Sequence, residues 1–514
     1  MYRQLSNIFK IFIFSPLFIY LGERSCIAYD EGFYILQAKW ILDRGNWITP
    51  LWFEDISLDR TIGIQFLIAL SQKIFGNSSF AIYIPSIISA ILMAFLTYKI
   101  HRALLDDKYA LISTLILSTT FLWINYANMA TQDIVYSSII TLGIYSTIKA
   151  NKTHRNSFFF LAGIWIGLAV MLKTFLTIIP FLGILPFLIS RKIIFKKFFW
   201  LGFFIGFLPF FIWSLLILTT HGIPIYSNLF SKFINLSKNN NFTNPFYFYF
   251  WNIPMNIFPW SLFLFAGFAG SSRLKNQTAK YFLFFYPLFI IGILSIFSTK
   301  TPYYPLQITT LLSINCYLGI SLVIQNKNFL ISLFKIINFI LIPITLMLGA
   351  ILVNFQIISI NIGLIREKYI IVGILLFSII WLSFNFVKSK NSKLICIIIG
   401  PYLLFSTILQ SGLITDRSQD LRIATENLIK SEKLENIKIN TITEGIDSEL
   451  SHSKIIKILT LMPKIGVGLK TLDNLESQNY AWTTTSKEEI KSEKELKLIS
   501  QSEDFAPWNL VLKE

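Results

Sequence analysis

The amino-acid sequence predicts an α-helical polytopic membrane protein with about thirteen transmembrane helices, interfacial helices and a small C-terminal α/β domain outside the cytoplasm. Of its 514 residues, 54% are hydrophobic and only 14% are charged, whereas soluble proteins are about 25% charged. Apolar runs of membrane-spanning length follow one another as far as residue 413, and 17 of the 28 acidic residues lie beyond it. We therefore expect a membrane body over residues 1–413 and a soluble domain over residues 414–514.

Thirteen apolar runs meet the requirement of about 20 predominantly apolar residues for a transmembrane helix. The first run is expected to remain as an anchor, because Glu23 and Arg24 stand where a cleavage site needs small residues. The runs cover residues 8–28, 78–100, 109–127, 132–150, 157–173, 175–190, 197–219, 254–271, 280–297, 304–324, 329–354, 368–387 and 393–413.

Basic residues concentrate in every second gap between these runs, beginning with Lys99, Arg102 and Lys108 and continuing with Lys149 and Lys152. Because Lys and Arg favour cytoplasmic loops, this alternation places the N-terminus in the cytoplasm and the C-terminal domain on the opposite side. The excess of 45 basic over 28 acidic residues thus has a topological explanation. No basic stripe interleaved with aromatic residues indicates a nucleic-acid partner, and the three cysteines are too scattered for a disulfide framework.

The long outer gap over residues 29–77 carries six of the eleven acidic residues of the membrane body. Residues 28–47 are predicted to form an amphipathic helix with Phe33 and Trp40 on its apolar side, and residues 63–76 form a second such segment, too short to span. Both are expected to lie along the membrane interface. Since a transporter usually keeps its outer loops short, these segments favour a roofed reaction site at the bilayer surface.

Three acidic residues are placed for chemistry. Asp30 and Glu31 head the first interfacial helix, so that one carboxylate could act as general base on an acceptor hydroxyl while the other orients it. Alternatively, both are N-terminal acids favoured by the helix macrodipole. Asp133 is the single acid between Asp107 and Glu367 and begins a transmembrane run. An ionisable group at membrane depth indicates function, although capping of the helix is the alternative.

Three cations lie on the outer side, where the topology does not require them: Arg60, Lys173 and Lys300. Such cations suit a phosphate, and the alternative for each is a side chain that snorkels to the interface. His221 opens a second outer gap, residues 221–251, and is interpreted as a turn residue. No metal-ligand cluster and no glycine-rich phosphate loop occurs, so the sequence predicts neither a metal site nor nucleotide hydrolysis.

In their order and topology, these segments resemble the GT-C superfamily of polyprenyl-phosphate-sugar-dependent glycosyltransferases. The nearest branches are the bacterial relatives of protein O-mannosyltransferases and of lipid A aminoarabinose transferases, and the resemblance covers about residues 8–330. Arg60 departs from the family, which has a lysine followed by two prolines at this place. The matching segments are Asp30-Glu31-Gly32-Phe33-Tyr34; Gly45-Asn46-Trp47 with Pro50; Arg60 to Gly63 and Phe75-Gly76; Asn128 to Asp133; Leu172-Lys173-Thr174; Asn244-Pro245 to Pro259-Trp260; and Ser298, Lys300, Pro302 and Tyr304-Pro305.

The resemblance implies transfer of a sugar from a polyprenyl-phosphate donor to a lipid, glycan or protein acceptor at the outer face of the bacterial inner membrane, with inversion. It implies that Asp30 is the base and that Glu31 and Asp133 are further active-site acids. It implies no cofactor, and a divalent cation at the acids is left open. The donor phosphate would be bound by Arg60, Lys173, Lys300 and Tyr304.

The C-terminal domain shows helical spacing over residues 420–434 and 454–461 and strand-like segments over residues 437–442, 480–483 and 508–512. We expect it to cap the active site, with acceptor selection as an alternative role. Two other functions are alternatives to glycosyl transfer for the whole chain. A lipid or solute transporter would have paired discontinuous helices and internal repeats, whereas a scaffold would leave the outer acids and cations without a purpose.

Overall fold

The computed structural model describes residues 11–514 except 59, 106–108, 223–242, 326–328, 360–361, 445, 447 and 501. Most of the second outer gap expected from the sequence therefore lies outside the described residues. The chain forms two compact units. The helical unit comprises Met1–Ile19, Ser86–Asn128 and Gln132–Ile414, and the mixed unit comprises Tyr20–Pro85, Met129–Thr131 and Thr415–Glu514.

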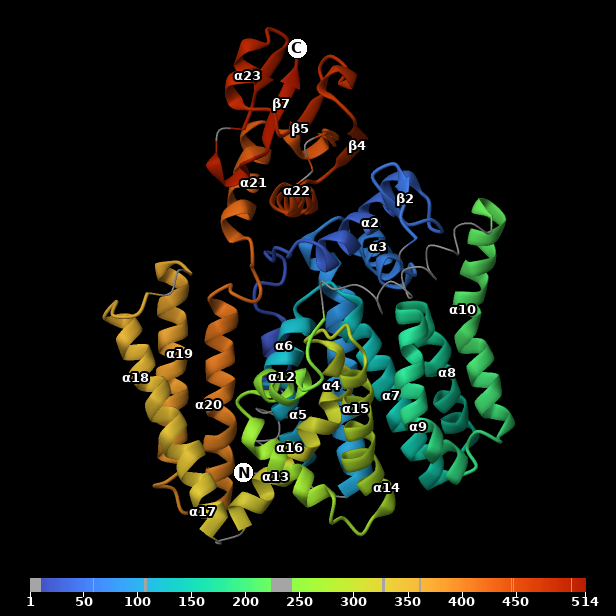
Figure 1. Cartoon of the computed structure of the whole chain (residues 1–514), viewed down its shortest axis with the longest axis vertical. Coiled ribbons are helices and arrows are strands. Elements are labelled where there is room, and N and C mark those ends of the chain that lie inside the picture. Colours follow the sequence, from blue (N-terminus) through green and yellow to red (C-terminus); the bar gives the residue numbers. More distant parts are fainter. Residues whose placement is uncertain are drawn as a thin grey trace. The chain divides into compact units, whose positions relative to one another are not determined.

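The helical unit consists of helices of different lengths (Figure 1). Two of its segments, η4 and η6, are π-helical turns that continue into α15 and α18. Helix α4 starts in the mixed unit and continues into the helical one. The elements are η1 (Ser15–Leu17), α4 (Ser79–Leu105), α5 (Ala110–Ser118), α6 (Phe121–Ala127), α7 (Gln132–Thr153), α8 (Asn156–Lys173), η2 (Thr174–Thr177), α9 (Ile178–Ser190), α10 (Lys197–His221), α12 (Phe248–Ile257), α13 (Ser261–Ser271), α14 (Gln277–Lys280), η4 (Tyr281–Phe285), α15 (Tyr286–Ile296), η5 (Tyr304–Ile308), α16 (Thr309–Gln325), α17 (Phe329–Ile336), η6 (Ile337–Leu341), α18 (Ile342–Asn354), α19 (Leu364–Ser383) and α20 (Lys390–Gln410).

The chain is a multi-pass membrane protein. Among the described residues, seven helical stretches are long and apolar enough to cross a membrane, and two bent pairs, α5 with α6 and α12 with α13, raise the number to nine. The thirteen crossings expected from the sequence exceed this number and stay a prediction. Among the described residues of the first apolar run, residues 11–17 are helical, and the chain then enters turns in which Tyr20 and Gly22 adopt positive φ.

Helices α8 and α10 run parallel and touch through glycines. A Cβ on Gly163 would lie 2.0 Å from the carbonyl oxygen of Phe199, and one on Gly206 would lie 2.1 Å from that of Ile164. Since contact pairs advance together along both helices, the two are parallel, and α9 between them has to run back. The seven stretches include residues 156–190 only once, so the two separate runs expected there stay a prediction.

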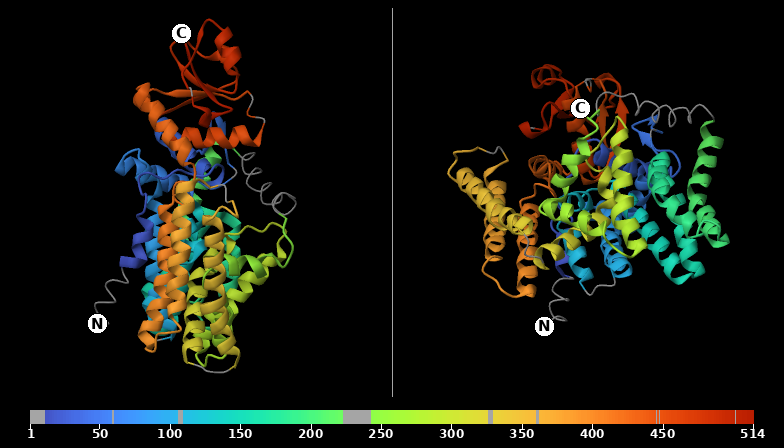
Figure 2. Two further views of the ribbon diagram at one scale, coloured as in Figure 1. Left: turned by 90° about the vertical axis from the view of Figure 1, so that its left-hand side faces the viewer. Right: turned by 60° about the horizontal axis from the view of Figure 1, so that its bottom comes forward.

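The mixed unit combines the long outer loop with the C-terminal domain. Its five-stranded sheet has the order β4-β3-β5-β7-β6, with β3 parallel to both neighbours and β7 antiparallel to both of its own (Figure 2). The elements are α2 (Asp30–Arg44), β1 (Leu51–Trp52), β2 (Asp55–Ile56), α3 (Gly63–Phe75), α21 (Gln419–Ser431), η7 (Leu434–Asn436), β3 (Ile439–Ile442), α22 (Glu449–Leu461), β4 (Ile465–Leu469), η8 (Leu472–Asn474), β5 (Tyr480–Thr483), α23 (Lys487–Ser492), β6 (Leu496–Leu498), η9 (Glu503–Phe505) and β7 (Asn509–Lys513).

The small C-terminal α/β domain is confirmed, although β4, β6 and α23 were not expected. Both loop helices are also present as α2 and α3. Helix α2 differs from a surface helix, because its polar residues Gln37 and Lys39 are buried along with Leu36 and Trp40. Leu36 and Trp40 share one apolar core with residues of α22 and the sheet, including Ile455, Leu459, Trp482 and Trp508. The outer loop and the C-terminal domain thus form one body.

Candidate functional site

Asp30 is the first residue of α2 and forms an ion pair with Arg60. Arg60 donates from Nη1 to Oδ1 of Asp30 at 2.7 Å and to the hydroxyl oxygen of Tyr34 at 2.5 Å. The side chain of Asp30 is 42% exposed. A partly exposed carboxylate is accessible to an acceptor hydroxyl, as a general base has to be.

Glu31 is fully buried beside Asp30. Its Oε2 accepts a hydrogen bond from the backbone N–H of Ile27 at 3.0 Å, and its Oε1 accepts one from that of Ala130 at 2.8 Å. Burial raises the pKa of Glu31, and the charge of Arg417 and these N–H donors oppose that rise. Both oxygens are therefore engaged in holding segments of the mixed unit together. The contacts favour a positioning role over direct contact with substrate.

Asp133 and Lys173 form a buried ion pair in the helical unit. Asp133 lies in the first turn of α7, and Lys173 is the last residue of α8, where Thr174 turns the chain at a φ of 41°. Lys173 donates from Nζ to Oδ1 of Asp133, and the two side chains are only 6% and 7% exposed. Neutralisation by the partner is what makes such burial tolerable.

Three tyrosines surround the ammonium group of Lys173. The ring centroids of Tyr303, Tyr136 and Tyr304 lie 5.0, 5.3 and 5.5 Å from its Nζ, within the range of cation–π attraction. These rings, the ion pair and Gln307 line a cavity of about 20 Å³, which is room for about one water molecule. A phosphate could enter only if the tyrosines moved apart.

Lys300 is held by its own loop. Its Nζ donates to the backbone oxygens of Asn244 at 2.8 Å and Phe297 at 2.5 Å, and it is 4% exposed. It is not among the residues that line the cavity at Lys173. To bind a phosphate, Lys300 would have to exchange these carbonyl oxygens for phosphate oxygens.

The structure thus divides the candidate residues into two groups. Asp30, Glu31 and Arg60 belong to the mixed unit, and Asp133, Lys173 and Tyr304 belong to the helical unit. Among the described residues, no three His, Cys, Asp or Glu side chains gather as a metal site would require. Sequence reasoning missed Tyr34, Tyr136, Tyr303 and Gln307. Of these, two had a signal, because Tyr34 ends the matching segment that begins at Asp30 and Tyr303 stands beside Tyr304.

Part of the chain is similar in sequence to known glycosyltransferases. Residues 59–214 match the family described as dolichyl-phosphate-mannose-protein mannosyltransferase, and this range includes Arg60, Asp133 and Lys173. A protein of Aquifex aeolicus without a described function is 26% identical over 56% of this chain and 58% of its own length. An undecaprenyl phosphate-α-4-amino-4-deoxy-L-arabinose arabinosyl transferase of Yersinia pestis is 29% identical over 32% of this chain and 30% of its own. The chain therefore matches less than two thirds of the length of these relatives.

The fold resembles that of ArnT from Cupriavidus metallidurans. With the structure of that protein bound to undecaprenyl phosphate, the TM-score is 0.76 at 14% identity, covering 99% of this chain and 98% of the other. With its apo structure, the TM-score is 0.69 at 12% identity, over the same fractions of both chains. The resemblance stated from the sequence is confirmed.

Proposed function

We propose that this chain, a GT-C-type membrane protein related to the polyprenyl-phosphate-dependent glycosyltransferases, transfers a sugar from a polyprenyl-phosphate donor to a lipid, glycan or protein acceptor. The proposal includes a location in the bacterial inner membrane, a cytoplasmic N-terminus, about thirteen crossings and a reaction at the extracytoplasmic face. The observation that carries it is the buried Asp133–Lys173 pair, because both residues and the neighbouring Tyr136 lie in the part of the chain that matches the family.

In the proposed reaction, the acceptor hydroxyl gives its proton to the carboxylate of Asp30. Its oxygen attacks the anomeric carbon, the bond from that carbon to the phosphate oxygen breaks, and polyprenyl phosphate leaves with the electron pair. The anomeric centre is inverted because attack and departure occur on opposite faces. Lys173 and Tyr304 would bind the leaving phosphate, and the planar guanidinium of Arg60 can bridge a carboxylate and a phosphate.

The remaining predicted residues have supporting parts. Asp133 would orient the ammonium of Lys173, which donates a hydrogen bond to its carboxylate. Glu31 would position the first turn of α2. Lys300 would contribute only after releasing the carbonyl oxygens of Asn244 and Phe297.

The test supplies the purified protein with undecaprenyl phosphate-α-4-amino-4-deoxy-L-arabinose and, separately, undecaprenyl phosphate-mannose, and measures release of undecaprenyl phosphate. Substitution Asp30→Asn should reduce release by about 10²- to 10⁴-fold, the usual contribution of a general base. Asp43→Asn is the matched control, because it makes the same change at an exposed position of the same helix. Undiminished release by the Asp30→Asn variant would exclude this residue as the base.

A transporter is the second candidate, and one observation favours it. The pairs α5–α6 and α12–α13 are bent by 65° and 110° at short breaks, as are the discontinuous helices of many transporters. The protein could move a polyprenyl-phosphate sugar between the leaflets of a vesicle without releasing undecaprenyl phosphate. In that case transport, and not glycosyl transfer, is its function.

A further inference from the structure

We propose that helix α22 of the C-terminal domain is a brace for helix α2 and sets the position of Asp30 at its first turn. This inference rests on the proposed function, because it assigns a task to the C-terminal domain in the same reaction. The term brace denotes α22 together with the residues 416–418 that precede α21. All of these residues and α2 belong to the mixed unit.

The two helices run parallel and are in contact at both ends. At the start, the hydroxyl of Tyr29 donates to the backbone oxygen of Glu449 at 3.1 Å. One turn further, the ring of Phe33 meets that of His452 edge to face, with centroids 6.0 Å apart. At the other end, Lys39 reaches the last turn of α22. Contact along the whole length fixes both the axial and the rotational position of α2.

Lys39 binds the C-terminus of α22 with its ammonium group. Its Nζ donates to the backbone oxygens of Leu459, Thr460 and Met462, at 3.3, 2.7 and 2.7 Å. The last carbonyl oxygens of a helix have no partner within it, and the negative end of the macrodipole favours a cation there. Burial lowers the pKa of Lys39 to about 8, so that it is still mostly protonated at pH 7. Lys39 is therefore a specific anchor of α22 on α2.

Gly32 allows the helices to approach closely at the critical turn. A Cβ at this position would lie 2.4 Å from Cγ2 of Ile456 and 3.2 Å from the backbone oxygen of Ile27. Real Cβ atoms essentially never show the first distance. With any side chain here, either the side chain of Ile456 or helix α2 itself would have to shift, one residue after Glu31 and two after Asp30.

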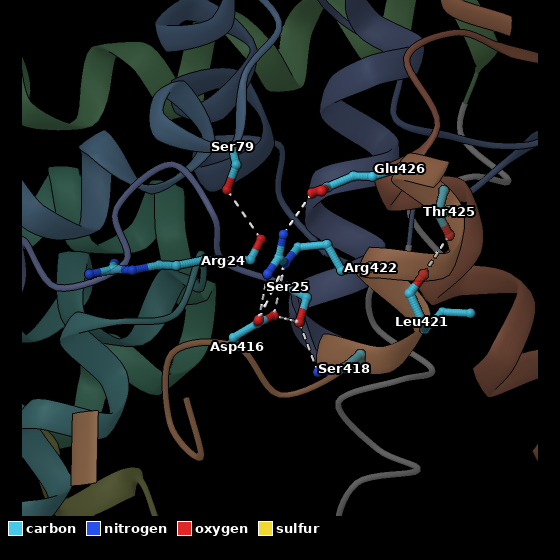
Figure 3. A network of polar contacts seen from close by, with 9 residues as sticks. All are labelled: Arg24, Ser25, Ser79, Asp416, Ser418, Leu421, Arg422, Thr425 and Glu426. Atoms are coloured by element: carbon cyan, nitrogen blue, oxygen red, sulfur yellow. Dashed lines mark hydrogen bonds and ion pairs between the residues drawn. The ribbon is translucent and has the colours of Figure 1, made fainter. Parts of the chain in front are cut away.

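The segment that leads into α2 is held by the same domain (Figure 3). Ser25 donates from Oγ to Oδ1 of Asp416 at 2.5 Å and accepts from the backbone N–H of Ser418 at 2.8 Å. Arg422 fixes Asp416 in turn, with Nη2 2.9 Å from Oδ2. Between this clamp and the helix, Tyr29 adopts a φ of 59°, a conformation that persists only where surrounding contacts enforce it. The brace supplies those contacts on both sides of Asp30.

The test compares Gly32→Ala with Gly349→Ala, which adds the same methyl group to helix α18 where nothing lies within 4 Å. Because alanine favours a helix more than glycine does, loss of activity at Gly32 cannot come from helix propensity. We expect kcat for release of undecaprenyl phosphate to fall by about 10²-fold, as for a misplacement of roughly 1 Å. The KM for the donor should stay within about twofold, because the donor phosphate is assigned to other residues.

A second substitution separates positioning from general damage. Ile456→Ala removes the methyl group that a Cβ at Gly32 would strike, so the double variant should recover kcat at least in part, limited by the oxygen of Ile27. Full activity of Gly32→Ala alone would overturn the proposed role of the brace. A loss of activity that Ile456→Ala does not relieve would overturn it as well.

A readout without donor keeps the brace testable if the proposed function fails. Hydrogen exchange of the backbone amides in the first turns of α2 should be faster in Lys39→Met than in the wild type, because release of α22 loosens α2. Unchanged exchange would refute the brace even in an active enzyme. Conversely, the wild type could fail to release undecaprenyl phosphate from either donor while Lys39→Met still shows faster exchange. That result would support the brace and would contradict only the proposed function.

Discussion

The ion pair of Asp133 and Lys173 allows a structural role to be separated from a catalytic one. Asp133→Asn leaves the ammonium of Lys173 without its counter-charge at a site where the side chain is 6% exposed. Removal of one partner of a buried pair costs about 3–5 kcal/mol, whereas replacement of both partners by uncharged groups is often close to neutral. We therefore expect Asp133→Asn to be destabilised by about 3 kcal/mol or more and Asp133→Asn/Lys173→Met to regain most of that stability.

The rate of undecaprenyl phosphate release should not change in parallel with the stability of these variants. If Lys173 binds the leaving phosphate, the double variant lacks a preorganised cation, and such a loss costs about 10²- to 10³-fold in rate. The stable double variant should thus be as inactive as the unstable single one. This divergence is the signature of a residue that does more than complete a buried pair.

The assay combines thermal unfolding followed by tryptophan fluorescence with release of undecaprenyl phosphate, on the wild type, both single variants and the double variant in one detergent. A double variant that releases undecaprenyl phosphate within tenfold of the wild type would show that the pair only stabilises the helical unit. Single variants as stable as the double variant would show that the two charges do not depend on each other.

Two further predictions concern stability. Burial lowers the pKa of His452 below its ordinary value of 6.5. As the pH falls through 6.5, His452 takes up a proton in the unfolded chain but not in the folded one. The wild type should therefore lose stability from about pH 6.5 downward. His452→Gln should lack this loss, and parallel melting curves of the two proteins between pH 7.5 and 5 would contradict the assignment. Gly163→Ala should destabilise the protein by about 1–3 kcal/mol, as overpacking does, because its Cβ would lie 2.0 Å from a backbone oxygen of α10. Gly292→Ala, in open space on α15, should change the melting temperature little; equal effects would refute the close approach.

The candidate residues that the sequence revealed are those whose charge contradicts their surroundings. Asp133 and Lys173 stood out singly, each as an ion within an apolar run, and the structure adds that they neutralise each other. The resemblance alone assigned Asp30 as the base, and the residues themselves did not predict that Asp30 is partly exposed and Glu31 buried. Adjacent carboxylates look alike in a sequence, whereas the exposure of one and the burial of the other depend on Ala130, which is 99 residues from Glu31.

Long-range contacts also explain where the predictions fell short. The period of α2 indicated a helix with one solvated side, but the polar residue Lys39 binds the C-terminus of α22 and is buried there. The burial of Lys39 depends on a segment some 420 residues away in the sequence. The local pattern of α2 therefore does not predict it. Strand β4 was missed because Gly466 and Gly468 dilute its strand propensity.

The glycine contacts between α8 and α10 determine which residues of these helices can be substituted. Only 22% of the most apolar stretch of α10 is buried within the described protein, so most of this helix would face lipid if it crosses a membrane. Lipid tails are as apolar as the side chains they touch, and burial from water does not hold the helix in place. Its attachment depends on backbone contact at Gly163, Gly167, Gly202 and Gly206. Apolar residues on the lipid side can thus exchange freely by mutation, while these four positions admit no side chain at all.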